Sequence, residues 1–88
     1  MKDLNKLREE IDQVDTRLLD LLSERVKLVQ EVGEYKKTND LPIVDPEREQ
    51  KIIDQKIEKA AHLNLRPEFI QKIWRTIFDE AYVLEEKV

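Results

Sequence analysis

The feature that most constrains this chain is one long apolar stripe over residues 4–37. Its members are Leu4, Leu7, Ile11, Val14, Leu18, Leu21, Leu28, Val32 and Tyr35, spaced at three, four or seven residues. This spacing predicts one face of an α-helix, with Asp3 as its N-cap. At ~1.5 Å per residue the helix is roughly 50 Å long. Two shorter helices of the same chain cannot cover such a stripe, so we expect a two-fold related copy to cover it.

Prolines divide the rest of the chain into two further helical segments. "TNDLP" (38–42) ends the first helix, because a residue that precedes a proline avoids the helical region. Asp45 and Pro46 are suited to the N-cap and first position of a second helix, and Pro67 opens a third. The sequence therefore predicts a single all-α domain over residues 1–88, with one very long and two shorter helices. The expected segments are helix 4–37, loop 38–45, helix 46–62 and helix 67–86.

Composition excludes several classes of protein. The chain has 88 residues and no cysteine, so neither disulfides nor a thiolate metal site can supplement the thin core of so small a domain. Charged residues make up 41% of the chain, but basic and acidic residues alternate and form no basic stripe, which argues against nucleic acid as a partner. No apolar run reaches the 18 residues of a membrane span, and no signal peptide is present. We expect a cytoplasmic protein.

Two basic residues of the long helix lie on its apolar face. Arg25 occupies a position where the heptad spacing predicts a core residue, and Lys36, eleven residues later, lies about 20° away around the helix. They are roughly 16 Å apart along the axis, so both side chains can reach a small dianion between them. Alternatively, the Arg25 head reaches solvent over a packed stem, and Lys36 is solvated near the helix end.

Arg8 precedes Arg25 by 17 residues, or about 25 Å along the same helix. It is therefore too far away to contact the same small ligand within one chain. In an antiparallel dimer, Arg8 of a second copy could come close to it. The alternative is an ordinary surface arginine.

The stretch "PIVDPERE" (42–49) begins the second helix and carries Asp45, Arg48 and Glu49. Helix capping accounts for Asp45, whereas Arg48 and Glu49 lead directly into the apolar positions of the second helix. Glu85 lies four residues after Ala81 on the apolar stripe of the third helix, unless the last turn frays and exposes it.

Nothing in the chain indicates nucleophilic or metal catalysis. Cysteine is missing, Gly33 is the only glycine, and the single histidine, His62, falls at a helix end. An enzyme made from these residues would have to act by positioning and electrostatics on an anionic substrate.

The segment "LREEIDQVDTRLLDLLSERVKLVQEVGEYK", then "PIVDPERE", then the third helix together resemble the small all-helical chorismate mutases over nearly the whole chain. These enzymes rearrange chorismate to prephenate on the route to phenylalanine and tyrosine. The resemblance implies an intertwined helical homodimer with two sites, each made from both chains. It also implies that the protein needs no cofactor and no metal.

The resemblance further implies a role for each candidate residue. Arg25, and Arg8 reaching in from the second copy, would bind the substrate's carboxylates, and Lys36 would bind a carboxylate and the ether oxygen. The residues expected around the substrate's hydroxyl group are Asp45, Arg48 and Glu49.

Two positions depart from the commonest pattern of the family. Ala81 stands where relatives often have serine, so one hydroxyl contact to the substrate is missing. Glu85 stands where many have glutamine, and an ionised carboxylate can only accept a hydrogen bond. We therefore hypothesise that Glu85 acts protonated, kept neutral by burial. Lys36 would oppose this by favouring the charged form.

Two other functions compete with this interpretation. An isochorismate pyruvate-lyase would use the same fold and similar cations to eliminate pyruvate. A non-catalytic helical dimerisation or regulatory module would not need Arg25, Lys36 and Arg48 together. Because the chain ends shortly after Glu85, we expect no fused dehydratase or dehydrogenase.

Overall fold

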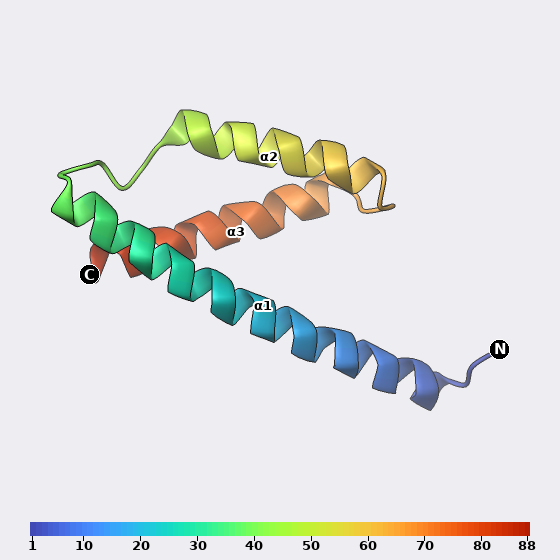
Figure 1. The fold of residues 1–88 in the computed structure, drawn as a ribbon. Helices are drawn as coiled ribbons and strands as arrows, with labels where there is room; N and C mark the ends of the chain where they lie inside the picture. Colours follow the sequence, from blue (N-terminus) through green and yellow to red (C-terminus); the bar gives the residue numbers. More distant parts are fainter.

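The computed structural model describes all 88 residues. They form three α-helices, the connections between them and short ends. The helices are α1 (Leu4–Thr38), α2 (Pro46–Ala61) and α3 (Pro67–Glu86). As Figure 1 shows, α3 packs against both α1 and α2, whereas α1 and α2 do not contact each other. The predicted all-α class, with one very long and two shorter helices, is confirmed. No helix combines the length and the apolar character that crossing a membrane requires.

The first two helices begin at the capping residues that the sequence predicts. Asp3 accepts a hydrogen bond from the backbone N–H of Lys6 at 2.8 Å. Asp45 accepts one from the backbone N–H of Arg48 at 3.2 Å. Each carboxylate satisfies one of the N–H groups that the first turn of a helix leaves without a partner.

α1 ends in a turn that returns the chain alongside its last residues. Asp40 adopts the left-handed conformation with φ 56°, and the N–H of Leu41 donates to the carbonyl of Lys36 at 2.8 Å. This is the hydrogen-bond pattern of a Schellman motif, in which an aspartate can replace the usual glycine. The turn brings the 39–45 loop beside the end of α1.

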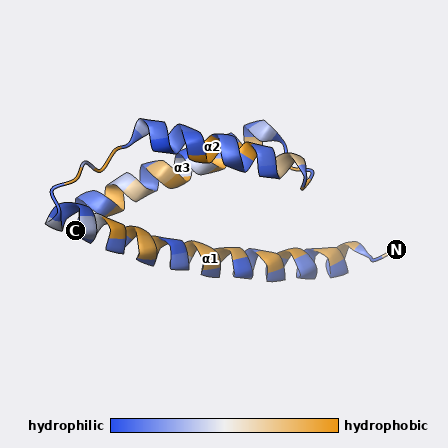
Figure 2. Cartoon of the chain, turned by 45° about the horizontal axis from the view of Figure 1, so that its top comes forward, coloured by the Kyte–Doolittle hydropathy of each residue, from blue (hydrophilic) through white to orange (hydrophobic).

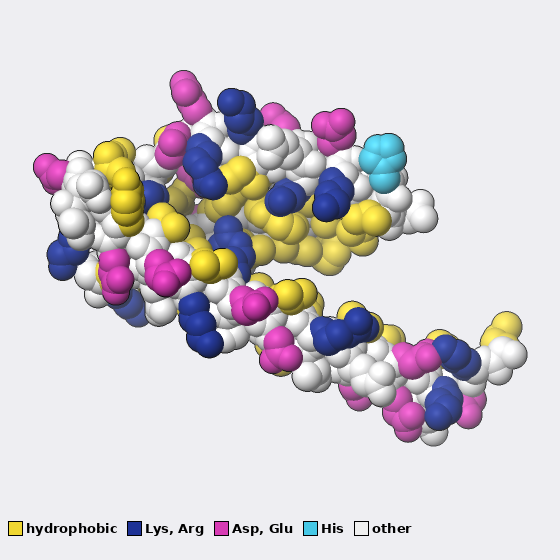
Figure 3. Space-filling model, in the orientation of Figure 1, with side chains coloured by type: hydrophobic (Ala, Val, Ile, Leu, Met, Phe, Trp, Pro, Cys, Tyr) yellow, Lys and Arg dark blue, Asp and Glu magenta, His cyan; other side chains and the backbone are white.

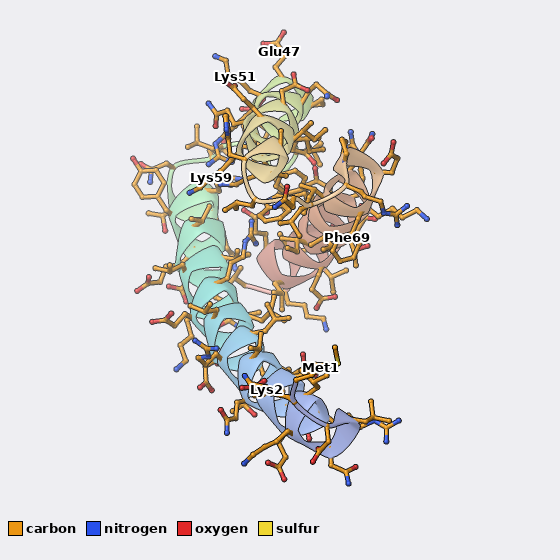
Figure 4. The ribbon with its side chains drawn as sticks, turned by 90° about the vertical axis from the view of Figure 1, so that its right-hand side faces the viewer. Met1, Lys2, Glu47, Lys51, Lys59 and Phe69 are labelled. Atoms are coloured by element: carbon orange, nitrogen blue, oxygen red, sulfur yellow. The ribbon has the colours of Figure 1, made fainter.

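The buried apolar residues all belong to α2 and α3. The buried apolar residues are Ile53, Ala60, Ile70, Phe78 and Ala81. α1 contributes only Gly33 to the buried set. Phe69, in the first turn of α3, is apolar but 47% exposed (Figure 4).

The N-terminal half of α1 extends away from α2 and α3 and leaves its apolar stripe uncovered (Figure 2). Leu7, Ile11, Val14 and Leu18 are between 42% and 57% exposed. The radius of gyration is 16.4 Å, against about 12 Å for a compact chain of this length. A single chain therefore leaves about half of the surface of these apolar side chains exposed to solvent.

Candidate active site

A cavity of about 540 Å³ lies where the second half of α1, the 39–45 loop, the start of α2 and the end of α3 meet. Figure 3 shows Lys and Arg side chains gathered in the recess between α1 and the other two helices, with apolar side chains around them. The charged residues that line the cavity are Arg25, Lys36, Asp45, Arg48, Glu49 and Glu85. Residues far apart in the sequence thus form one polar site on an apolar floor.

Seven of the eight candidate residues from the sequence line this cavity: the six charged residues named above and Ala81. Arg8 is the exception. It is exposed on the N-terminal part of α1, about 25 Å along the helix from Arg25. Within one chain, Arg8 therefore contributes nothing to the cavity.

Lys36 and Glu85 form an ion pair inside the cavity. The Lys36 Nζ lies 2.9 Å from the Glu85 Oε1, and the two side chains are 23% and 6% exposed. Lys36 also donates a hydrogen bond to the Ile43 carbonyl at 2.8 Å, which ties the loop to α1. The ion pair joins the end of α1 to the end of α3 within the cavity.

Arg25 and Arg48 face the same cavity, and no carboxylate lies within ion-pair distance of either guanidinium. Partial burial, and then the positive charge of Arg48, lower the pKa of Arg25 from its ordinary value. A guanidinium nevertheless remains charged in proteins. Arg25 is partly buried and Arg48 is exposed, and two guanidinium groups without counter-charges are suited to binding an anion in this part of the cavity.

The acidic residues of the 42–49 stretch differ in what they face. One oxygen of Asp45 is occupied by the cap of α2. Glu49 is only 8% exposed and lines the cavity. Glu47, by contrast, points outward from α2 into solvent (Figure 4). The motif therefore places Asp45 and Glu49 at the site and leaves Glu47 on the surface.

Tyr82 is a cavity residue that the sequence reasoning missed. It follows Ala81 and precedes Glu85 by three residues, a helical spacing that could have indicated it. Burial, then a hydrogen bond to Glu49 and the negative charge of that carboxylate, raise the pKa of Tyr82 to about 12. The tyrosine links α3 to Glu49 on α2.

We expect Tyr82 to retain its proton at pH values where a free tyrosine has lost it. With a pKa of about 12, roughly a tenth of Tyr82 is ionised near pH 11, against about nine-tenths for an ordinary phenol. Phenolate absorbance of a Tyr35→Phe variant, which leaves Tyr82 as the only tyrosine, measures this directly. Glu49→Gln should move the ionisation to lower pH. A Tyr82 mostly ionised near pH 11, with the helical circular dichroism intact, would contradict this prediction.

The fold and the site define a class: an all-helical protein with a cavity for a small anion, in which unpaired arginines and a lysine lie beside carboxylates. No group of three or more His, Asp or Glu side chains is arranged to hold a metal ion. The sequence profile described as chorismate mutase type II matches residues 7–86. The chain belongs to this family, which confirms the resemblance noted in the sequence.

Several relatives carry this domain in different settings. A T-protein of Enterobacter agglomerans is 42% identical over 94% of this chain and 22% of its own length. A chorismate mutase of Methanocaldococcus jannaschii is 31% identical over 96% of this chain and 85% of its own length. A bifunctional chorismate mutase/prephenate dehydratase of Aquifex aeolicus is 38% identical over the whole chain and 25% of its own length. The chain thus spans about a quarter of the length of some of these relatives.

Proposed function

We propose that the protein is a chorismate mutase, which rearranges chorismate to prephenate. The observation that carries this proposal is the pair of arginines without counter-charges beside the Lys36–Glu85 ion pair, in a chain of the chorismate mutase type II family. The volume of about 540 Å³ falls in the range of small-molecule sites.

The rearrangement is pericyclic, so it requires no proton transfer and no covalent intermediate. The enzyme must hold a flexible dicarboxylate in its compact conformer, which is a positioning effect. Arg25 and Arg48 offer the planar, bidentate donors that suit carboxylates. Their approach from two different helices restrains the substrate at two points.

Negative charge grows on the ether oxygen as its bond to the ring breaks. Lys36, held by Ile43 and Glu85, is a fixed donor for this charge. Glu85 can donate a second hydrogen bond only when it is protonated. Asp45 and Glu49 are left to accept from the substrate's hydroxyl group, and Ala81 leaves space where relatives often place a hydroxyl.

The charges of the cavity support both a neutral Glu85 and a second copy of the chain. Three cations (Arg25, Lys36, Arg48) face three carboxylates (Asp45, Glu49, Glu85), so the cavity is neutral before a substrate with two negative charges enters. Protonation of Glu85 would supply one compensating positive charge. Arg8 from a second copy would supply the other.

A homodimer also agrees with the uncovered stripe of α1. Leu7, Ile11, Val14 and Leu18 lie exposed on the same segment that carries Arg8. Packing this segment along a second copy would bury the stripe and bring Arg8 to the other copy's cavity. We therefore propose a single three-helix domain that works as an intertwined dimer with two sites.

Replacing Glu85 with Gln should flatten the pH dependence of kcat. Activity of the wild type is expected to fall with rising pH through a single ionisation, because the ionised carboxylate cannot donate to the ether oxygen. Gln donates at any pH. The measurement is kcat from about pH 4.5 to pH 9, with the exposed neighbour Glu86→Gln as control. If Glu85→Gln keeps the wild-type profile, Glu85 is not the titrating group.

The assay that tests the proposed function follows conversion of chorismate to prephenate by the purified protein. Conversion that is lost on replacing Arg25 supports the mutase. Release of pyruvate from isochorismate, without turnover of chorismate, would instead identify a lyase on the same fold. If neither substrate reacts, a non-catalytic dimerisation or regulatory module would replace the proposal.

A further inference from the structure

Gly33 is the only glycine of the chain, and it is buried near the C-terminal end of α1. Its backbone does not require glycine, because no glycine here has a positive φ. Inside a helix, glycine is less favourable than alanine, since it loses more conformational freedom on folding. The reason for glycine at this position must therefore lie in what packs against it.

The last turn of α3 rests directly on Gly33. A Cβ at this position would lie 3.0 Å from the Glu85 Cα, 3.2 Å from the Glu85 Cγ and 2.7 Å from the Val88 Cγ2. The Val88 side chain can rotate away from such an atom. The Glu85 Cα is backbone, so it can yield only if the end of α3 moves relative to α1.

The same contact controls the geometry of the cavity. Gly33 lies one turn before Lys36 on α1, and the residue packed against it is Glu85 itself. The spacing of the two helices at Gly33 thus sets how far apart the Lys36 and Glu85 side chains begin. They meet at 2.9 Å.

We propose that Gly33 is a positioning residue, whose missing side chain lets the end of α3 approach α1 closely enough for Glu85 to reach Lys36 and the reacting atoms. The inference rests on the proposed function, which places Lys36 and Glu85 at the ether oxygen. Gly33 itself contacts neither substrate nor reacting atoms in this account.

The test is Gly33→Ala in the 88-residue chain, with Glu34→Ala, at the adjacent exposed position, as the matched control. A displacement of a few tenths of an ångström should lower kcat by about tenfold, because even small misplacements of catalytic groups are costly. KM should change less than about twofold, since Arg25 and Arg48 lie elsewhere in the cavity. A KM increase with unchanged kcat would overturn the proposal.

A double-mutant cycle separates positioning from general packing. If Gly33 acts through Glu85, then Gly33→Ala lowers kcat by less than about twofold in a Glu85→Ala background. An equal decrease in both backgrounds would overturn the proposal. Gly33→Ala combined with Val88→Ala removes the 2.7 Å contact and leaves those to Glu85. This variant should remain impaired, and recovery of wild-type kcat would assign the effect to Val88 instead.

A readout without catalysis distinguishes this inference from the proposed function. Crystal structures of Gly33→Ala and Glu34→Ala measure the separation of the Lys36 Nζ and the Glu85 Oε1, which is 2.9 Å in the wild type. Gly33→Ala should lengthen this separation, because a Cβ at position 33 displaces the end of α3, whereas Glu34→Ala should leave it unchanged. An unchanged separation in Gly33→Ala overturns the inference even in an active enzyme, and a longer one upholds the geometry even if chorismate is not converted.

Discussion

Replacing Lys36 with Met is expected to lower kcat by about 10²–10³-fold, the effect of removing one fixed donor to a developing oxyanion. Lys36 is the only ammonium group in the cavity, and its position is set by both the Ile43 carbonyl and Glu85. Met keeps most of the aliphatic stem and removes the charge. The measurement is steady-state kcat and KM with chorismate.

The same substitution should also destabilise the fold wherever Glu85 is ionised, because it leaves that carboxylate buried without a partner. Breaking a buried ion pair by removing one member costs about 3–5 kcal/mol of unfolding free energy. Adding Glu85→Gln should restore much of the stability but not the activity. This double variant separates loss of the donor from loss of folded protein.

Lys27→Met is the matched control for Lys36. Lys27 is exposed on α1, nine residues before Lys36 and therefore about half a turn away around the helix. It should change neither kcat nor stability appreciably. If Lys36→Met retains wild-type kcat, the ammonium does not act at the ether oxygen, and the proposed mechanism fails at its central step.

Replacing Arg25 with Met should lower kcat/KM by about 30- to 5,000-fold. This range corresponds to the 2–5 kcal/mol that truncating one partner of a buried charge pair costs. Arg8→Met should also impair the enzyme severely, although Arg8 lies outside the cavity of its own chain. Arg66→Met, at an exposed arginine before α3, is the control.

Mixing the two inactive variants provides the decisive measurement for a shared site. If each site takes Arg25 from one copy and Arg8 from the other, half of randomly re-formed dimers are mixed, and each mixed dimer has one intact site. Activity should therefore recover to about a quarter of the wild-type value after unfolding and refolding together. A mixture that stays as inactive as its components would show that Arg8 does not complete a second copy's site.

Much of the fold could be predicted because helices and their caps depend on neighbours in the chain. Asp3 and Asp45 act within three residues of themselves, so their hydrogen bonds follow from local sequence. Periodicity likewise assigned Arg25 and Lys36 to one face, and both line the cavity. Phe69 shows the limit of this reasoning: it directly precedes the buried Ile70 and is itself apolar, but it is 47% exposed.

The contacts that define the site are different in kind, because they join residues that periodicity does not relate. Lys36 and Glu85 meet only because α3 crosses the end of α1, and Tyr82 reaches Glu49 only because α2 packs on α3. The sequence shows a solitary Gly33 without its reason, which is the backbone of Glu85 pressed against it.

By itself, the sequence determined three helices, their ends, the charged residues on their apolar faces and the need for a further surface to cover α1. Side-chain spacing and capping are properties of the local chain, and 3.6 residues per turn is sufficient to derive them. Only the tertiary structure decided which charges pair and which are left free for an anion. That outcome depends on distances of a few ångströms between helices, which no local pattern encodes.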